Sequence, residues 1–261
     1  MLLLELGARP VIAHRGSPAQ RPENTLASFH RAVELGADAL ELDVHLSADG
    51  IAVVIHDRTL DRTTDRSGPV AAHPLASLRQ ADAGARFTTD GGRTHPWAGR
   101  GVQIPTLDEI LESFPHISLV IEIKCRGAQH AVRQALQRHA AEGRCLLASY
   151  DSAALTVFDS PRFLSGGSRA DALRLLLTTT LRRPAAAIRP RALFLPTHYG
   201  GVPILTRRLV DEARAQGVPV HAWTVDDPAY AARLWRKGVC GIVSNQADAM
   251  LTARGIAPPC H

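Results

Sequence analysis

The chain has 261 residues, a formal net charge of +5 at pH 7 and a hydrophobic fraction of 45%. This length fits one large domain or two small ones, and the hydrophobic fraction is ordinary for a globular protein with a buried core. A basic balance is compatible with nucleic-acid binding, but no run of basic residues interleaved with aromatic residues supports it, and aromatic residues make up only 5% of the chain. We therefore expect a globular protein without a nucleic-acid partner.

The sequence also lacks the signals of a membrane or exported protein. The longest apolar runs are far shorter than a membrane span. The apolar stretch from Met1 to Leu6 lacks the basic region and the cleavage site of a signal peptide. The cysteines show no paired spacing typical of zinc or redox sites, which favours reduced thiols; they are Cys125, Cys145, Cys240 and Cys260. These features predict a cytoplasmic protein without membrane insertion and leave the oligomeric state open.

The first predicted strand leads directly into two polar residues. Residues 10–13 (PVIA) form a short apolar run that ends in His14 and Arg15. A helix is predicted after Asn24, a residue type that caps helix N-termini, with a Pro-Glu pair just ahead of it. The apolar face of this helix would consist of Leu26, Phe29 and Val33.

The second predicted strand carries a pair of carboxylates. Within residues 39–44 (ALELDV) the polar positions are Glu41 and Asp43, which share one face because side chains two apart on a strand point the same way. Two such carboxylates repel each other unless a cation or a proton lies between them. After a Ser-Ala-Asp-Gly turn, residues 52–55 form a return arm that ends in His56, which predicts a β-hairpin.

Residues 57–105 interrupt this regular pattern. They hold clusters of Arg, Thr, Asp and Gly and one short helical candidate at 75–81. A segment of this length without strand–helix alternation is uncommon inside a compact domain and is usually functional or an inserted subdomain. We interpret residues 57–105 as an inserted subdomain at the mouth of the fold.

Strands and helices alternate through the rest of the chain. Helices are predicted at residues 107–114, 128–142, 153–158, 169–177, 206–216, 227–237 and 247–254. Strands are predicted at 119–124, 145–150, 163–166, 192–195, 218–225 and 240–244, with 178–191 as a loop. Counting the hairpin with the second strand gives eight strand–helix units, which predicts an α/β fold, a (β/α)8 TIM barrel, in one domain over residues 1–261. A doubly wound sheet is less favoured, because HRGSPAQ stands where a GxGxxG-type loop would follow the first strand.

An ordered series of motifs gives the sequence a family resemblance. The first five are HRG at 14–16, PENT at 22–25, ELDV at 41–44, VVIHD at 53–57 and TLDRTT at 59–64. Weaker matches follow in IPTLDEIL from 104, IEIK from 121, AWTVDD from 222 and GIVSNQAD from 241. The chain resembles the glycerophosphodiester phosphodiesterases over nearly its whole length, and the resemblance implies the same insertion at the barrel mouth.

Carboxylates at strand ends are the candidate metal ligands. Catalytic groups of such barrels lie at the C-terminal ends of strands, where Glu41 and Asp43 end the second strand and Glu122 ends the third. An alternative is a solvated strand end paired with arginines, but acids inside apolar strands are costly to bury unpaired. Three carboxylates suit one hard divalent cation, Mg²⁺ or Ca²⁺, and the resemblance implies the same three ligands.

Two of the twelve histidines are candidates for acid–base catalysis. Most histidines are structural or solvated, but His14 and His56 each follow an apolar strand and each match a family motif. His45 lies two positions further along the strand face that carries the carboxylate pair and is a candidate to line the site. His198 and His221 lie near strand ends and are left unassigned.

Basic and aromatic side chains complete the predicted site. Arg15 and Lys124 would hold phosphate oxygens, Arg with a planar fork and Lys with a point charge, and Arg15 is counted with the catalytic residues. Salt bridges from these two to the neighbouring carboxylates are an alternative that does not exclude this role. Trp223 would form a wall for the alcohol portion of the substrate. The last strand ends in Ser-Asn-Gln at 244–246, where many relatives carry Thr-Asp-Arg-Pro, so a family contact made there is in doubt.

The resemblance implies metal-dependent hydrolysis of glycerophosphodiesters to glycerol 3-phosphate and an alcohol. One histidine would activate the attacking hydroxyl and the other would protonate the departing alkoxide. The sequence decides neither which histidine takes which role nor whether water or the substrate's own glycerol hydroxyl attacks. One alternative is a phospholipase D-like barrel enzyme acting on lysolipid or sphingolipid head groups, disfavoured by the long insertion. An alternative of another class is a non-catalytic barrel that binds a phosphate ligand, disfavoured because both histidines and all three acids are present.

Overall fold

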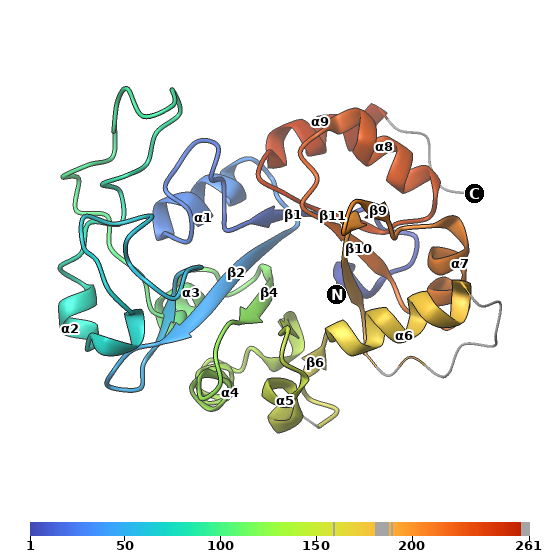
Figure 1. Cartoon of the computed structure of the whole chain (residues 1–261), viewed down its shortest axis with the longest axis horizontal. Helices are drawn as coiled ribbons and strands as arrows, with labels where there is room; N and C mark the ends of the chain where they lie inside the picture. The colour runs from blue at the N-terminus through green and yellow to red at the C-terminus, as the bar shows by residue number, and fades with distance from the viewer. Residues whose placement is uncertain (159, 181–187, 189, 257–261) are drawn as a thin grey trace.

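The computed structural model describes residues 1–158, 160–180, 188 and 190–256. Within these ranges eight parallel strands are adjacent in the order β6-β5-β4-β2-β1-β11-β10-β7. In chain order they are β1 (Val11–His14), β2 (Ala39–Leu46), β4 (Ser118–Ile123), β5 (Cys145–Ala148), β6 (Leu164–Ser165), β7 (Leu193–Pro196), β10 (Val220–Trp223) and β11 (Gly241–Ser244). A parallel bridge between Gly166 and Ala192 joins the two ends of this order, so the sheet curls round on itself. The fold is TIM-barrel-like, as the alternation predicted (Figure 1).

Helices connect the strands and surround the sheet (Figure 1). The α-helices of the described residues are α1 (Leu26–Glu34), α2 (Leu75–Leu78), α3 (Leu107–Ser113), α4 (Ala128–Arg138), α5 (Ser152–Leu155), α6 (Arg169–Thr180), α7 (Arg207–Ala215), α8 (Pro228–Arg236) and α9 (Ala247–Ile256). Short 3-10 turns lie at η1 (Leu2–Leu4), η2 (Val70–Ala72), η3 (Glu142–Arg144) and η4 (Thr156–Phe158). Helix α8 begins as predicted, with Asp227 as its cap and Pro228 at its first position.

The start and the apolar face of α1 differ from the sequence prediction. Thr25, not Asn24, is the N-cap, because the Thr25 hydroxyl accepts a backbone amide of the first turn. Phe29 is fully buried and Leu26 partly buried, as predicted, but Val33 is 41% exposed and Ala32 is buried in its place. The prediction was therefore wrong at one position of the apolar face.

Helices α4 and α6 also differ in length from the prediction. Helix α4 ends at Arg138 and not at 142, because Ala140 adopts a left-handed φ of +46° and the chain turns there. Helix α6 continues to Thr180, three residues beyond its predicted end. Of the loop predicted at 178–191, residues 181–187 and 189 lie outside the described residues.

Two antiparallel hairpins are attached to the barrel. The predicted one pairs β3 (Ala52–Val54) with β2. The other, β8 (His198–Tyr199) with β9 (Val202–Pro203), was not predicted. Its two turn residues are Gly200 and Gly201, both at positive φ, which glycine adopts without steric cost.

The inner face of the sheet is apolar at one end and polar at the other. Ile12 of β1 lies beside Ala39 of β2, and both pack with Leu3 of η1 in a buried cluster. Two residues further along the same face, His14 lies beside Glu41, because side chains alternate along a strand. The apolar end is the floor of the barrel, and the polar end gathers side chains where the strands finish.

The outer face of the same strands packs against the helices. Leu40 and Leu42 of β2 and Ile121 of β4 are fully buried with Phe29 of α1 and Leu136 of α4. Fully burying a side chain of this size contributes about 1.5–3 kcal/mol. Because inward and outward side chains alternate, this outer packing fixes which residues of β2 and β4 face the interior.

Residues 57–105 lie beyond the C-terminal end of β2 (cyan to green, at the left of Figure 1). Apart from α2 and η2, this fully described segment is irregular. It shares a hydrophobic cluster with β3 that is distinct from the main core; the cluster consists of Val53, Ile55, Leu60, Val70, Leu78, Ala81, Ala83 and Ile104. The segment therefore folds on a small core of its own.

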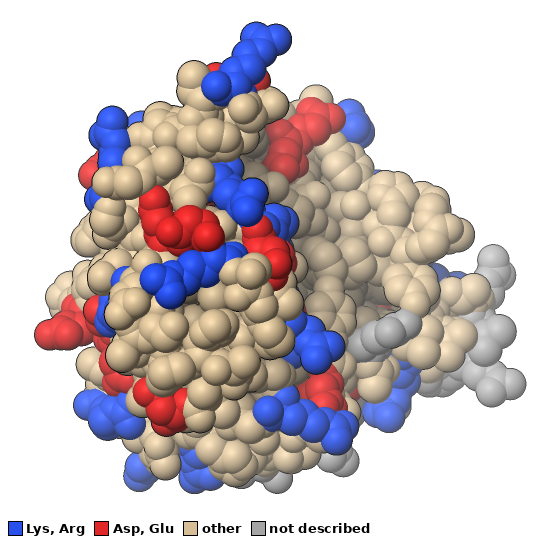
Figure 2. All heavy atoms as spheres, turned by 60° about the vertical axis from the view of Figure 1, so that its left-hand side comes forward, with Lys and Arg blue, Asp and Glu red and all other residues tan. Residues whose placement is uncertain are grey.

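Two further features of the described residues concern membranes and surface charge. In the described ranges, no helix has the length and apolarity that crossing a bilayer requires. Figure 2 brings the left side of Figure 1 forward and shows Lys and Arg intermixed with Asp and Glu. The charge of that face is thus locally balanced.

His221 of β10 is fully buried at the barrel floor. Its Nε2–H donates to the Leu3 carbonyl oxygen at 2.9 Å, and its Nδ1 has no hydrogen-bond partner among the described residues. Its ring lies against Phe194, with 4.8 Å between the ring centroids. Burial lowers the pKa of His221 to about 4, although the bond to Leu3 opposes this shift.

Acidification is expected to destabilise the protein through His221. Its pKa is about 4 in the folded state and about 6.5 in an unfolded chain, so between these values the unfolded state binds more protons. The contribution of His221 to the free energy of unfolding is therefore intact above about pH 6.5 and falls with pH, by about 3 kcal/mol in total once the pH is below about 4. Urea unfolding across this range should show a flatter pH dependence for His221→Gln than for wild type. The exposed His116 offers the control, since His116→Gln should keep the wild-type dependence; parallel curves for all three proteins would contradict the prediction.

Candidate active site

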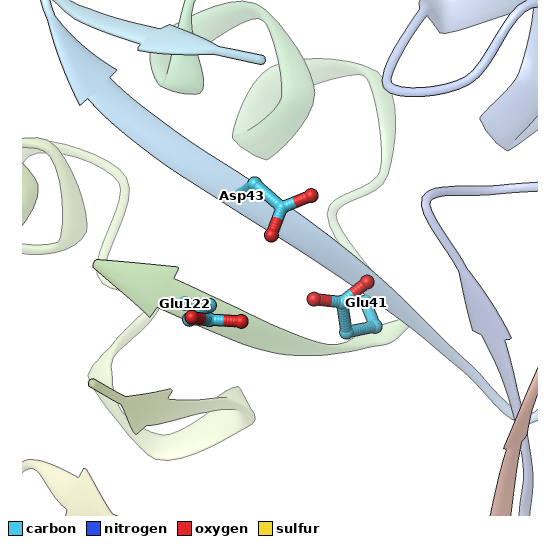
Figure 3. A group of neighbouring side chains, drawn as sticks. All are labelled: Glu41, Asp43 and Glu122. Atoms are coloured by element: carbon cyan, nitrogen blue, oxygen red, sulfur yellow. The ribbon is translucent and has the colours of Figure 1, made fainter. Parts of the chain in front are cut away.

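Three carboxylates meet at the C-terminal end of the barrel interior. Glu41 and Asp43 lie on β2 and Glu122 on β4, with Asp43 and Glu122 at paired positions of the two strands. One oxygen of each side chain lies within 4.8 Å of the others, and the three carboxylates point toward one another (Figure 3). The structure therefore brings together the three acids that the sequence singled out.

The chemistry of these oxygens fits a hard cation. Asp43 Oδ1 and Glu122 Oε1 are buried, and Lys124 Nζ forms an ion pair with each of them at 2.9 Å. Oxygen ligands bind Ca²⁺ at about 2.3–2.6 Å, so an ion can contact three oxygens at this spacing simultaneously. The residues present are thus suited to one divalent cation.

Burial and mutual repulsion dominate the electrostatics of the acids. Burial, followed by the charges of Asp43 and Glu122, raises the pKa of Glu41 well above its usual range. Burial also raises the pKa of Glu122. Burial opposes ionisation of Asp43 as well, but Lys124 and Arg15 together bring the pKa of Asp43 below its usual value. A divalent cation would favour the ionised form of all three.

The loop after β1 wraps round Asp43. Arg15, at a left-handed φ of +57°, places its Nε 3.2 Å from Asp43 Oδ2 and donates from Nη1 to Glu23 Oε1 at 3.0 Å. Asn24 donates from Nδ2 to Asp43 Oδ2 at 2.9 Å. Asn24 is therefore not a helix cap but a support for a candidate metal ligand.

His14 ends β1 at the edge of the acid cluster. Its Nε2 lies 3.9 Å from Glu41 Oε2, and its Nδ1 lies 2.7 Å from Asn245 Oδ1. Burial, followed by the charge of Arg15, lowers the pKa of His14. This shift favours the neutral imidazole, the state in which it can accept a proton.

His56 follows β3 and is held from two sides. Its Nδ1–H donates to Asp57 Oδ1 at 2.6 Å, and Asp57 in turn accepts from Arg62 Nε at 2.7 Å. Arg62 also binds both carboxylate oxygens of Glu23, which connects the insertion to the loop after β1. The buried His45 donates from Nε2 to the His56 carbonyl oxygen at 3.0 Å. His45 thus anchors the backbone of His56.

The remaining candidates divide between the mouth and the rest of the barrel. Trp223 is half-buried at the end of β10 and packs edge-on against Tyr150, with 6.3 Å between the ring centroids. Tyr150 follows β5 and is 59% exposed. His198 lies exposed on β8 and His221 on the floor, and neither joins the acid cluster.

Sequence reasoning missed the residues that hold the two histidines. Asp57 and Arg62 stand inside two of the matched motifs, so their place in the family pattern was the available signal. Asp226 and Asn245 also stand inside two of the weaker motifs, AWTVDD and GIVSNQAD, but the link between them is visible only in three dimensions. Tyr150 carried no signal beyond its position after a strand.

A barrel that presents hard-cation ligands beside two histidines and two basic side chains is the framework of a hydrolase acting on phosphate esters. Comparison with known proteins makes the class specific. Residues 14–249 match the model of the glycerophosphoryl diester phosphodiesterase family. The chain belongs to this family, which confirms the resemblance and the assignment as a phosphodiesterase.

Individual relatives cover nearly the whole chain. The glycerophosphodiester phosphodiesterase of Caldanaerobacter subterraneus subsp. tengcongensis is 33% identical over 252 residues, which cover 92% of this chain and 96% of the relative. A phosphodiesterase of Oleispira antarctica, solved with the product sn-glycerol-3-phosphate, is 30% identical with a TM-score of 0.77, covering 95% of this chain and 97% of that one. The corresponding domain of a Mycobacterium tuberculosis protein is 24% identical with a TM-score of 0.85, covering 95% and 99%, and supports the fold alone.

Proposed function

We propose that this enzyme hydrolyses glycerophosphodiesters to glycerol 3-phosphate and an alcohol, using one divalent cation, Mg²⁺ or Ca²⁺, and the two histidines His14 and His56. The observation that carries the proposal is the convergence of Glu41, Asp43 and Glu122 within 4.8 Å beside His14. The glycerol 3-phosphate bound to the Oleispira relative supports the same product here.

The three acids would hold the cation, which supplies positive charge that stabilises the transition state at the phosphate. Arg15 and Lys124 already lie against the carboxylates and would bind phosphate oxygens as well, Arg15 as a catalytic group. Trp223 would contact the alcohol portion. These residues orient the phosphate between the two imidazoles.

Each histidine would move one proton. One imidazole accepts the proton of the attacking hydroxyl as its oxygen bonds to phosphorus. The other donates a proton to the alcohol oxygen as the bond from phosphorus to that oxygen breaks. The product alcohol leaves neutral. The first histidine then releases its proton to solvent and the second takes one up, which restores both groups. Placement of His14 and His56 on different strand ends supports a position on either side of the phosphate.

A substrate panel tests the proposal. Metal-free enzyme is supplied with Mg²⁺, Ca²⁺ or Mn²⁺ and offered glycerophosphodiesters with different alcohols, a lysolipid and bis(nitrophenyl) phosphate. Turnover of the glycerophosphodiesters with release of glycerol 3-phosphate is expected. Turnover of the lysolipid alone would indicate the phospholipase D-like activity, and binding without turnover of any substrate would indicate a non-catalytic phosphate-binding barrel.

We further propose a single cytoplasmic domain, 1–261, that acts on a small-molecule substrate, with residues 57–105 as an insertion that shapes the alcohol pocket. Cys125 and Cys145 form no disulfide in the structure, which is compatible with a reducing compartment. The Arg62–Glu23 contact and the packing of Arg21 on Trp97, 4.9 Å from the ring centroid, support the location of the insertion at the barrel mouth.

Shortening the insertion is expected to change substrate preference and leave the barrel folded. The exposed tip 88–95 lies outside the cluster that holds the segment together, so its replacement by a short Gly-Ser linker should cost little stability. The ratio of kcat/KM values between glycerophosphodiesters with large and small alcohols should shift, with the melting temperature nearly unchanged. An unchanged ratio in a folded variant would contradict the role of the insertion.

A further inference from the structure

A chain of hydrogen bonds behind His14 determines which of its ring nitrogens carries the proton. His14 Nδ1 lies 2.7 Å from Asn245 Oδ1, and Asn245 Nδ2 lies 2.8 Å from Asp226 Oδ2. Two further contacts fix the other oxygen of the same carboxylate, since Asp226 Oδ1 accepts the Asn245 backbone N–H at 2.8 Å and the Ser244 hydroxyl at 2.9 Å. Each bond is as short as a good hydrogen bond.

The carboxylate at one end gives this chain a direction. An ionised carboxylate only accepts hydrogen bonds, so the Asn245 atom that faces Asp226 must be the NH₂ group. The Asn245 atom that faces His14 is then the carbonyl oxygen, which also only accepts. His14 Nδ1 must therefore carry a hydrogen, and in the neutral imidazole Nε2 carries none.

The second ring nitrogen faces the acid cluster. His14 Nε2 lies 3.9 Å from Glu41 Oε2, which is too far for a hydrogen bond, so Glu41 does not hold a hydrogen on Nε2 by hydrogen bonding. The lone pair of Nε2 is thereby turned toward the place where the substrate would bind. Proton exchange with a hydroxyl of the substrate or of water would take place at this atom.

We propose that Asp226 and Asn245 are positioning residues that fix the tautomer of His14 and aim its reactive nitrogen at the phosphate. The proposal deepens the function proposed above and rests on it for the role of His14. It also accounts for the asparagine at 245, where many relatives carry aspartate. The asparagine donates to Asp226 and accepts from His14, whereas an aspartate at 245 would place two carboxylates next to each other.

Reversing the donor–acceptor direction of the hydrogen bonds between residues 226, 245 and His14 tests this arrangement. In Asp226→Asn the side-chain oxygen stays with the backbone amide and the Ser244 hydroxyl, so its NH₂ group faces Asn245. Asn245 then turns its oxygen toward residue 226 and its NH₂ toward His14, which forces the hydrogen of the imidazole onto Nε2. A wrong tautomer in a serine-protease triad costs about 10⁴-fold in kcat, and here a loss of about 10²–10⁴-fold in kcat is expected with KM little changed.

The double variant Asp226→Asn with Asn245→Asp should regain most of the lost kcat. Its new amide at 226 donates to the new carboxylate at 245, which accepts from His14 Nδ1 and restores the original tautomer. Asn245→Asp alone should lose activity because of repulsion with Asp226. Asp227→Asn is the matched control: Asp227 caps α8 through the Ala229 amide, asparagine caps equally well, and activity should stay at the wild-type level.

The tautomer is also measured directly, without turnover. The ¹⁵N resonances of the imidazole, assigned by comparison with His14→Gln, should show the hydrogen on Nδ1 in wild type and in the double variant and on Nε2 in Asp226→Asn. A wild-type spectrum with the hydrogen on Nε2 would overturn the proposal, even if a variant failed to fold. Equal activities of Asp226→Asn and Asp227→Asn would also overturn it. If wild-type enzyme does not turn over glycerophosphodiesters, the proposed function fails while the spectra still decide the tautomer.

Discussion

Excess chelator is expected to abolish turnover of glycerophosphodiesters, and added Mg²⁺ or Ca²⁺ is expected to restore it. The reason is the geometry of Glu41, Asp43 and Glu122, each of which places one carboxylate oxygen within 4.8 Å of the others. Without a cation the transferred phosphate would meet a cluster of carboxylates that repels it. The loss should therefore reach the detection limit of the assay.

Asp43→Asn should reproduce the effect of the chelator in a folded protein. The amide keeps the size of the side chain but removes the negative charge that Lys124 contacts at Oδ1 and that Arg15 and Asn24 contact at Oδ2. Metal affinity measured by calorimetry should fall at least about tenfold, in line with losses seen even for outer residues of metal sites. Asp151→Asn is the control, since Asp151 is partly exposed, lies in the loop after β5 and caps α5. Full activity in excess chelator, or wild-type metal affinity in Asp43→Asn, would refute the assignment.

Removal of either histidine is expected to lower kcat by about 10²–10⁴-fold, the usual contribution of one acid–base group. His14→Ala and His56→Ala should keep their fold and most of their metal affinity, because neither ring belongs to the acid cluster. The loss in the double variant should be smaller than the product of the single losses, because the two groups act as a unit.

A better leaving group distinguishes the two roles. Nitrophenolate leaves without protonation, so bis(nitrophenyl) phosphate should rescue only the variant that lacks the general acid. The variant that lacks the general base should stay slow with both kinds of substrate. If either single variant turns over a glycerophosphodiester at close to the wild-type rate, that histidine is structural and the mechanism is wrong.

The barrel and the candidate site could be predicted from the sequence because both depend on local patterns. Period-two alternation in ALELDV placed Glu41 and Asp43 on one face, and the rule that catalytic groups lie at strand ends singled out Glu122 on the next predicted strand. Helix starts such as Asp227-Pro228 carry their own capping chemistry. Strand alternation and helix capping are determined by residues close together in the sequence, so they can be predicted from it.

Predictions failed where tertiary contacts override a local preference. Asn24 is a good helix cap by type, but its amide is taken by Asp43, nineteen positions away, so Thr25 caps α1 instead. The Gly-Gly turn at 200–201 was a local hairpin signal that the prediction overlooked. The link from Asp226 through Asn245 to His14 joins three strand ends and cannot be inferred from spacing.

The alternation along β2 restricts how this enzyme can evolve. Deleting or inserting one residue before Glu41 would turn both of its acids toward the helices and bring Leu40 and Leu42 into the polar interior. Selection should remove gene variants with such length changes in β2 or β4, whereas related sequences should tolerate length changes in the exposed tip 88–95. New substrate ranges can therefore arise by loop variation while the reaction chemistry is inherited unchanged.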